Sequence, residues 1–158
     1  MMTENVTGYC IDSSCFINMV RNQPQDLFPG LWVNLRGLVD NKALFVHRMV
    51  RDELTAKDDA AAAWVKAITL DLLIELDNQQ AAFINQMSND HTHLRYLYQQ
   101  PDYAKKADPY LIATSKLRGY CVVTDEGPRD WHIPNICDRY QVPSLKLFDF
   151  MRKMNWRF

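Results

Sequence analysis

The 158-residue chain has no apolar run near the length of about 20 residues that a membrane-spanning helix needs. Its first residues, from Met1 to Asn5, also lack the basic and then apolar order of a secretory signal. Neither sign of charge dominates, because 18 Lys and Arg residues are set against 19 Asp and Glu residues. A strongly basic surface for nucleic acid is therefore not expected. These absences favour a cytoplasmic protein with no membrane contact.

Cysteine patterns and the common catalytic motifs are also missing. No two of the four cysteines form a Cys-x-x-Cys pair, so neither a zinc ribbon nor a redox motif is indicated. Cys10 and Cys121 lie in apolar runs, which is typical of small buried side chains in a reducing compartment. His91 and His93 have no cysteine at metal-site spacing, and we interpret them as surface or packing residues. Hydrolase-elbow and nucleotide-loop motifs do not occur.

The apolar pattern predicts an α/β fold in a single domain covering residues 1–158. Four short strands are expected at residues 9–12, 43–46, 120–124 and 144–147. Helical spacing predicts helices at residues 13–20, 31–39, 51–56, 60–65, 108–118, 134–140 and 148–154. Residues 60–100 are read as helix only, within a helical elaboration at about 57–106. Strands that alternate with helices predict a mostly parallel sheet.

The helix at residues 108–118 carries the clearest end signals. Asp108 is expected as its N-cap and Pro109 as its first helical residue, because both types favour those positions. Gly119 is expected as its C-cap, where a left-handed backbone suits glycine.

Acidic residues recur at the ends of these elements. Asp12 closes the first strand, Glu53 follows the second, Asp108 opens a helix, and Asp125 closes the third strand with Glu126 beside it. Ligands in α/β folds gather at the carboxyl edge of the sheet, where such residues can converge. Two bare charges about 4 Å apart repel by roughly 4 kcal/mol at an effective dielectric of about 20. A divalent cation between the carboxylates would remove this cost.

Oxygen ligands of this kind suit Mg²⁺ or Mn²⁺, and such ions support phosphodiester hydrolysis. Ser14 or Thr124 is expected to hydrogen-bond a carboxylate or a metal-bound water. Each acid taken alone has a simpler reading as a helix cap, a turn residue or a solvated charge. The joint pattern is what indicates a metal-dependent nuclease.

Four segments, in this order, resemble the PIN-domain nucleases and in particular the VapC-like toxins. They are Asp12-Ser13-Ser14, Val50-Arg51-Asp52-Glu53-Leu54, Ala107-Asp108-Pro109-Tyr110-Leu111-Ile112-Ala113 and Val122-Val123-Thr124-Asp125-Glu126. A later segment, Ile133-Pro134-Asn135-Ile136-Cys137, resembles a bacterial branch of the same family. The resemblance extends from Tyr9 to Phe158.

The resemblance implies a three-layer α/β/α fold, a Mg²⁺ or Mn²⁺ site and endoribonuclease activity on RNA. It also implies a small antitoxin protein as partner, and a homodimer. Asp12, Glu53 and Asp108 fall on the family's acidic positions. Strict alignment puts Glu126 on the fourth position, whereas Asp125 lies nearer the strand end and is slightly favoured here.

We therefore expect a metal-dependent endoribonuclease, the toxin of a type II toxin–antitoxin pair. Asp12, Glu53, Asp108 and Asp125 are the expected catalytic residues, with Glu126 as a further metal ligand. Two alternatives stay open: a stand-alone RNA-processing nuclease, and a non-catalytic module that keeps the fold for binding. A DNA-directed nuclease of the flap-endonuclease type is disfavoured by the small size and balanced charge.

Overall fold

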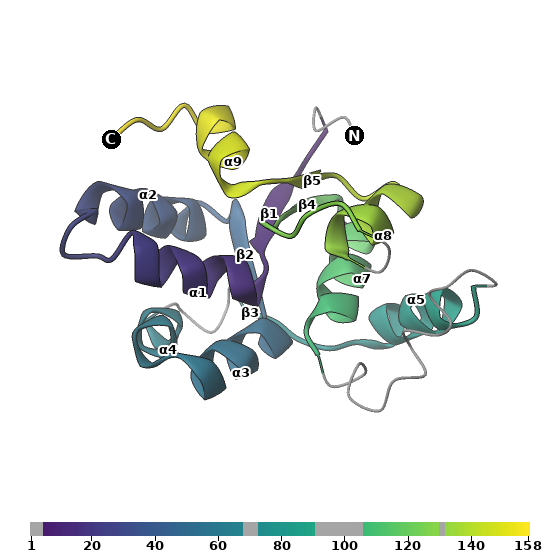
Figure 1. Cartoon of the computed structure of the whole chain (residues 1–158). Helices are drawn as coiled ribbons and strands as arrows, with labels where there is room; N and C mark the ends of the chain where they lie inside the picture. Colours follow the sequence, from purple (N-terminus) through teal and green to yellow (C-terminus); the bar gives the residue numbers. More distant parts are fainter. Residues whose placement is uncertain (1–4, 68–72, 91–105, 130–131) are drawn as a thin grey trace.

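A computed structural model describes residues 5–67, 73–90, 106–129 and 132–158 (Figure 1). In these residues five strands form one parallel sheet in the order β3-β2-β1-β4-β5. The strands are β1 (Gly8–Ile11), β2 (Leu44–His47), β3 (Leu73–Ile74), β4 (Tyr120–Val123) and β5 (Ser144–Leu145). His91 and His93 lie outside the described residues.

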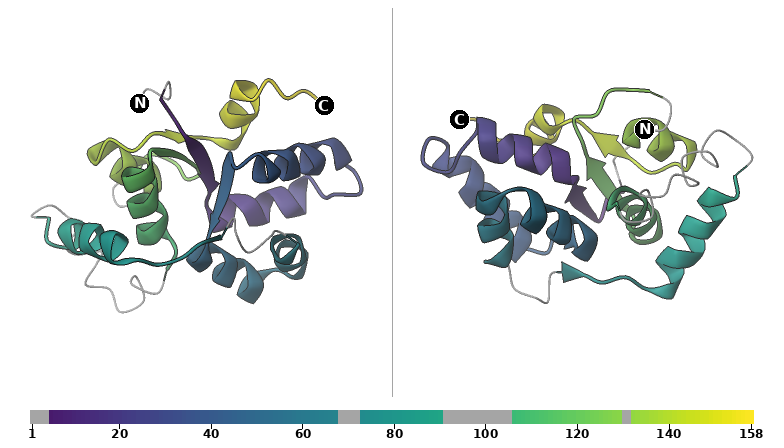
Figure 2. Two further views of the ribbon diagram at one scale, coloured as in Figure 1. Left: turned by 180° about the vertical axis from the view of Figure 1, so that it is seen from behind. Right: turned by 60° about the horizontal axis from the view of Figure 1, so that its bottom comes forward.

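Eight helices accompany the sheet in the described part of the chain. They are α1 (Ser13–Asn22), α2 (Pro29–Asp40), α3 (Arg48–Lys57), α4 (Asp59–Lys66), α5 (Asn78–Ser88), α7 (Asp108–Arg118), α8 (Ile133–Arg139) and α9 (Leu147–Lys153). Helices α1 to α4 lie on one side of the sheet, and α5, α7 and α8 lie on the other (Figures 1 and 2). The predicted three-layer α/β/α fold with a parallel sheet is confirmed. No described helix is both long and apolar enough to cross a membrane.

The two central strands set the position of the candidate site. All residues of β1 and β4 are buried, and the strands pair in register from Gly8 opposite Tyr120 to Ile11 opposite Val123. The next residues, Asp12 and Thr124, therefore leave the sheet side by side. The backbone N–H of Asp12 donates to the carbonyl of Val123 at 3.0 Å, which extends the pairing by one step.

One strand was not expected. Residues 60–100 were predicted to contain helices only, and that prediction is wrong at β3, which pairs with Val46 and His47 of β2. A two-residue strand is too short to show the alternation of apolar and polar residues by which strands are recognised. Its existence depends on the exposed edge of β2, which only the assembled sheet supplies.

The start of α7 also differs from the prediction. Ala107 occupies the cap position, and Asp108 is the first helical residue, so the assignment of Asp108 as N-cap was wrong by one residue. The reason lies in another helix, because Glu53 of α3 accepts the backbone N–H of Ala107 and takes the place of a local cap. The carboxylate of Asp108 is thereby left uncommitted. Gly119 ends the helix with a φ of 75°, as expected for a left-handed C-cap.

Candidate active site at the carboxyl edge of the sheet

Asp12 is fixed at the junction of β1 and α1. Its Oδ1 accepts the backbone N–H of Cys15 at 2.6 Å, which caps α1. Its Oδ2 accepts the hydroxyl of Thr124, which follows β4. Because both carboxylate oxygens have a donor on a rigid element, the orientation of this buried side chain is set by the sheet itself.

The environment of Asp12 opposes its ionisation. Burial raises the pKa of Asp12 from 3.8 to about 6, against the lowering effect of the hydrogen bonds from Thr124 and Cys15. The charges of Glu126 and Asp125 raise it further. A cation at this place would reverse that balance.

Asp108 lies at the first turn of α7, half-buried and close to the same group of acids. Burial raises the pKa of Asp108 from 3.8 to about 7, and the charges of Glu126, Asp12 and Glu53 add to the shift. The charge of Lys106 acts in the opposite direction and lowers the pKa of Asp108. No hydrogen bond or ion pair joins this carboxylate to another residue of the described part of the chain.

Glu53 connects α3 to the start of α7. One carboxylate oxygen, Oε1, accepts the backbone N–H of Ala107, next to Asp108. The other, Oε2, lies 3.5 Å from Nζ of Lys57, whose side chain is 59% exposed. The spacing of four residues between Glu53 and Lys57 would have predicted this pair from the sequence. Because the Lys57 side chain is exposed to water, this ion pair is weak, and Oε2 remains available to a ligand.

Glu126 and Asp125 are neighbours in the chain but face different surroundings. Glu126 Oε2 accepts the backbone N–H of Ile133 at 2.7 Å, and its charge acts on both Asp12 and Asp108. Asp125 is exposed, and its Oδ1 accepts the backbone N–H of Leu147 at 3.0 Å. Asp125 acts on the pKa of Asp12 but is not among the charges that shift Asp108.

The hydroxyls of Thr124 and Ser14, which were expected to support the carboxylates, also lie in different surroundings. Thr124 is buried, donates to Asp12 and accepts the backbone N–H of Glu126 at 3.2 Å, so it links two of the acids. Ser14 is exposed on the first turn of α1, and no hydrogen bond joins its hydroxyl to another described residue. The structure thus brings Asp12, Glu53, Asp108, Glu126 and Thr124 together, with Asp125 at the margin and Ser14 in solvent.

The chemistry of these residues suits a hard divalent cation. Among the described residues, no three His, Cys, Asp or Glu side chains form a ready-made ligand set. Mg²⁺ keeps several of its waters, however, and needs only one or two direct carboxylate ligands. An uncommitted Asp108 among three further acids offers such ligands. Burial first, and then the charges of the neighbouring acids, raise the pKa values of Asp12 and Asp108.

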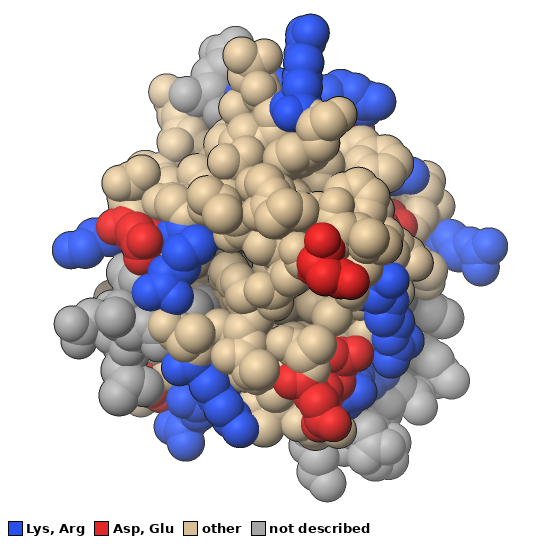
Figure 3. Space-filling model, turned by 90° about the vertical axis from the view of Figure 1, so that its left-hand side faces the viewer, with Lys and Arg blue, Asp and Glu red and all other residues tan. Residues whose placement is uncertain are grey.

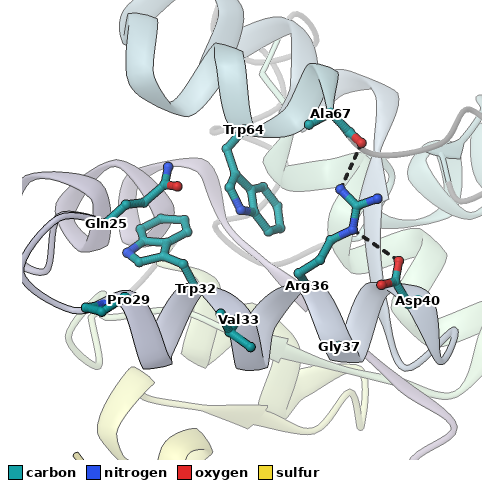
Figure 4. A pocket seen from close by; sticks show the side chains of 9 residues that line it. All are labelled: Gln25, Pro29, Trp32, Val33, Arg36, Gly37, Asp40, Trp64 and Ala67. Carbon is teal, nitrogen blue, oxygen red and sulfur yellow. Dashed lines mark hydrogen bonds and ion pairs between the residues drawn. The ribbon is translucent and has the colours of Figure 1, made fainter.

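A separate cavity of about 560 Å³ lies between α2 and α4. Figure 4 shows Trp32 and Trp64 on one side of it and Arg36 on the other. Arg36 donates to Asp40 Oδ1 at 3.1 Å and to the carbonyl of Ala67 at 2.8 Å. Because Asp40 is the only acid in its lining and is paired with Arg36, this cavity is not part of the acidic site.

The surface at the left of Figure 1 carries charges of both signs around a largely uncharged centre (Figure 3). Lys and Arg side chains on this face are spread along its edges and do not join into a continuous stripe. Charge alone therefore does not mark this face as a nucleic-acid-binding surface.

The fold and the acidic group define an α/β/α protein with a cluster of carboxylates at the carboxyl edge of a parallel sheet. The model of the family described as a domain of unknown function, DUF4411, matches residues 9–158, and the chain belongs to that family. The match begins in β1 and continues to the last residue, so it includes every acid of the cluster. A search of curated proteins finds no match.

Proposed function

We propose that this protein is a Mg²⁺- or Mn²⁺-dependent endoribonuclease of the PIN type, acting as the toxin of a toxin–antitoxin pair. The observation that carries the proposal is the state of Asp108. Its carboxylate has no partner among the described residues, yet burial and three neighbouring acids raise its pKa to about 7. Such a group is costly to a folded protein unless it serves a ligand of opposite charge.

In this proposal Asp12, Asp108 and Glu126 hold the cation, and Glu53 orients the attacking water. A bound divalent ion would neutralise these carboxylates and polarise the phosphate. Thr124 and the Cys15 amide keep Asp12 in one orientation, which preserves the geometry between turnovers. Oε2 of Glu53, paired only with the exposed Lys57, accepts a hydrogen bond from the water.

The reaction is an in-line displacement at phosphorus. Water forms a new P–O bond and releases a proton. The bond from phosphorus to the 3′ oxygen breaks, and that oxygen leaves with the bonding electrons and takes up a proton. The products are a 3′-hydroxyl and a 5′-phosphate. Lys106, whose charge acts on Asp108, is exposed two residues before α7, and in this proposal it would attract the RNA backbone.

We assign the fourth acidic position to Glu126, in place of the Asp125 favoured from the sequence. The charge of Glu126 acts on both Asp12 and Asp108, whereas that of Asp125 acts on Asp12 alone of the two. Both residues also cap a following helix, so capping by itself does not separate them. The two residues differ in their effect on Asp108, because the charge of Glu126 raises the pKa of Asp108.

An antitoxin and a second copy of the chain are part of the proposal through the resemblance to toxins. Exposed apolar side chains give some support for a protein contact. Leu27 is 71% exposed, Val33 69% and Phe158 64%. Phe158 lies against α2, because a Cβ added at Gly30 would meet its ring at 3.3 Å. Large apolar side chains exposed on or beside α2 are candidates for such a contact.

The test is cleavage of a single-stranded RNA by the purified chain with Mn²⁺, with EDTA, and in the Asp108→Asn variant. The proposal requires cleavage that depends on Mn²⁺ and falls at least 100-fold in the variant. Asp26→Asn is the control, because Asp26 is exposed and lies outside the acidic group. Absence of cleavage by a folded chain that still binds RNA would instead support the non-catalytic binding module.

A further inference from the structure

A cavity of about 270 Å³ lies beside the acidic cluster, between the exposed face of α1 and the start of α9. We propose that it binds one nucleotide of single-stranded RNA next to the phosphate that is cleaved. The residues that carry this inference are Asn18, Asn22, Asp125, Lys146 and Phe148. The inference rests on the proposed nuclease function, since it names the subsite through which the substrate would be held.

The cavity and the acidic cluster share a wall. Asp125 lines the cavity, while its neighbour Glu126 belongs to the cluster around Asp108. Consecutive Cα atoms are about 3.8 Å apart, so the lining of the cavity and the acidic cluster meet at two adjacent residues of the chain. The hydrogen bond from the Leu147 N–H to Asp125 Oδ1 fixes the wall against α9.

Two amide side chains on α1 face this space. Asn18 and Asn22 are four residues apart, so they lie on one face of the helix, and both are exposed. Neither side chain has a partner among the described residues. An amide carries donors and an acceptor, which are the groups that read the edge of an unpaired base or a 2′-hydroxyl.

The start of α9 supplies the other two elements of a nucleotide site. Phe148 is 59% exposed and lines the cavity. An exposed ring offers a stacking surface for a base. Lys146, two residues earlier, is exposed and forms no ion pair with any other described residue, so it is free to contact a phosphate.

Size and composition together favour a single nucleotide. The volume of about 270 Å³ lies just below the usual range for small-molecule sites, about 300–1,000 Å³, so it leaves little room beyond one nucleoside. A stacking ring, an unpaired cation and unpaired amides match the base, phosphate and hydrogen-bonding edges of that unit. An apolar peptide anchor would leave the amides and the lysine without partners.

The test measures fluorescence anisotropy of a labelled six-nucleotide single-stranded RNA with Mn²⁺, in a chain made inactive by Asp108→Asn. Phe148→Ala should weaken binding about tenfold, in line with loss of one stacked base. Asn18→Ala with Asn22→Ala should weaken it about fivefold. Lys146→Ala should lower the slope of log affinity against log salt by about 0.7, the value for one phosphate on a single strand.

The control is Leu117→Ala, which truncates an apolar side chain that is 44% exposed on α7 and lies outside both sites. The affinity of this variant for the RNA should stay within twofold of that of the Asp108→Asn chain. The positions altered in addition to Asp108 are all exposed, so circular dichroism should show the same fold in each variant as in Asp108→Asn alone. In the active chain, Phe148→Ala should raise KM about tenfold and change kcat less than threefold.

The outcomes separate this inference from the proposed function. If the active chain cleaves RNA but Phe148→Ala and the double asparagine variant bind like the parent, the nucleotide site is refuted and the nuclease stands. If no chain cleaves RNA but the variants weaken binding as expected, the nucleotide site stands and the nuclease is refuted.

Discussion

Removing the charge of Asp108 should make the metal-free protein more stable, and only at higher pH. The folded-state pKa of Asp108 is about 7, well above its ordinary value of 3.8, so the folded protein resists ionisation of this group. An unfolded chain ionises near the ordinary value and gains stability relative to the folded state as pH rises. The penalty therefore begins above about pH 4, grows to about pH 7 and is then constant.

The size of the effect follows from the same shift. The difference between a pKa of 3.8 in the unfolded chain and about 7 in the folded protein corresponds to about 4 kcal/mol in the free energy of unfolding. Because Asp108 is half-buried and water screens part of its interaction with the other acids, we expect a gain of about 2–3 kcal/mol for Asp108→Asn at pH 8. At pH 4 the wild-type carboxyl is neutral in the folded state, and the gain should vanish.

Urea denaturation in EDTA, followed by tryptophan fluorescence at pH 4, 6 and 8, measures this dependence. The control Asp26→Asn removes an exposed acid outside the acidic cluster, and its free energy of unfolding should stay within about 0.5 kcal/mol of the wild type. Adding Mn²⁺ at pH 8 should stabilise the wild type and not Asp108→Asn, since the ion replaces the penalty with attraction. The electrostatic account of this site would be refuted if Asp108→Asn were less stable than the wild type at pH 8. It would also be refuted if the difference in the free energy of unfolding were the same at every pH.

Three further predictions test the site and its support. Glu126→Gln should lower kcat for RNA more than 100-fold and Asp125→Asn less than tenfold, in steady-state cleavage; the reverse order would restore Asp125 as the fourth acid. Thr124→Val should cost about 1–3 kcal/mol in urea denaturation and lower kcat about tenfold, because Asp12 loses a buried donor. Gly8→Ala should cost about 1–3 kcal/mol, because its Cβ would lie 2.6 Å from the ring of Phe45; an unchanged denaturation midpoint would exclude that clash.

The acidic cluster was predictable in part because it depends on strand ends. Continuous apolar runs at residues 9–11 and 120–123 can only be buried strands or short buried helices, and both proved to be central strands of a parallel sheet. Parallel strands bring their carboxyl ends to one edge, and the pairing of β1 with β4 then places Asp12 beside the residues after Val123. Gly119 was predictable for a similar local reason, since its left-handed φ suits glycine.

The sequence by itself thus determined the layered α/β architecture and the edge at which the acids gather, because burial patterns and helix ends are local properties. The tertiary structure decided the rest. Glu53 caps α7 across 54 residues of sequence, and β3 exists only because β2 presents an open edge. Asp125 accepts the backbone N–H of Leu147 in α9, whereas Glu126 accepts that of Ile133 in α8. The two adjacent carboxylates are therefore held by different helices. Contacts between distant segments fix these directions, which the apolar pattern of the strands does not encode.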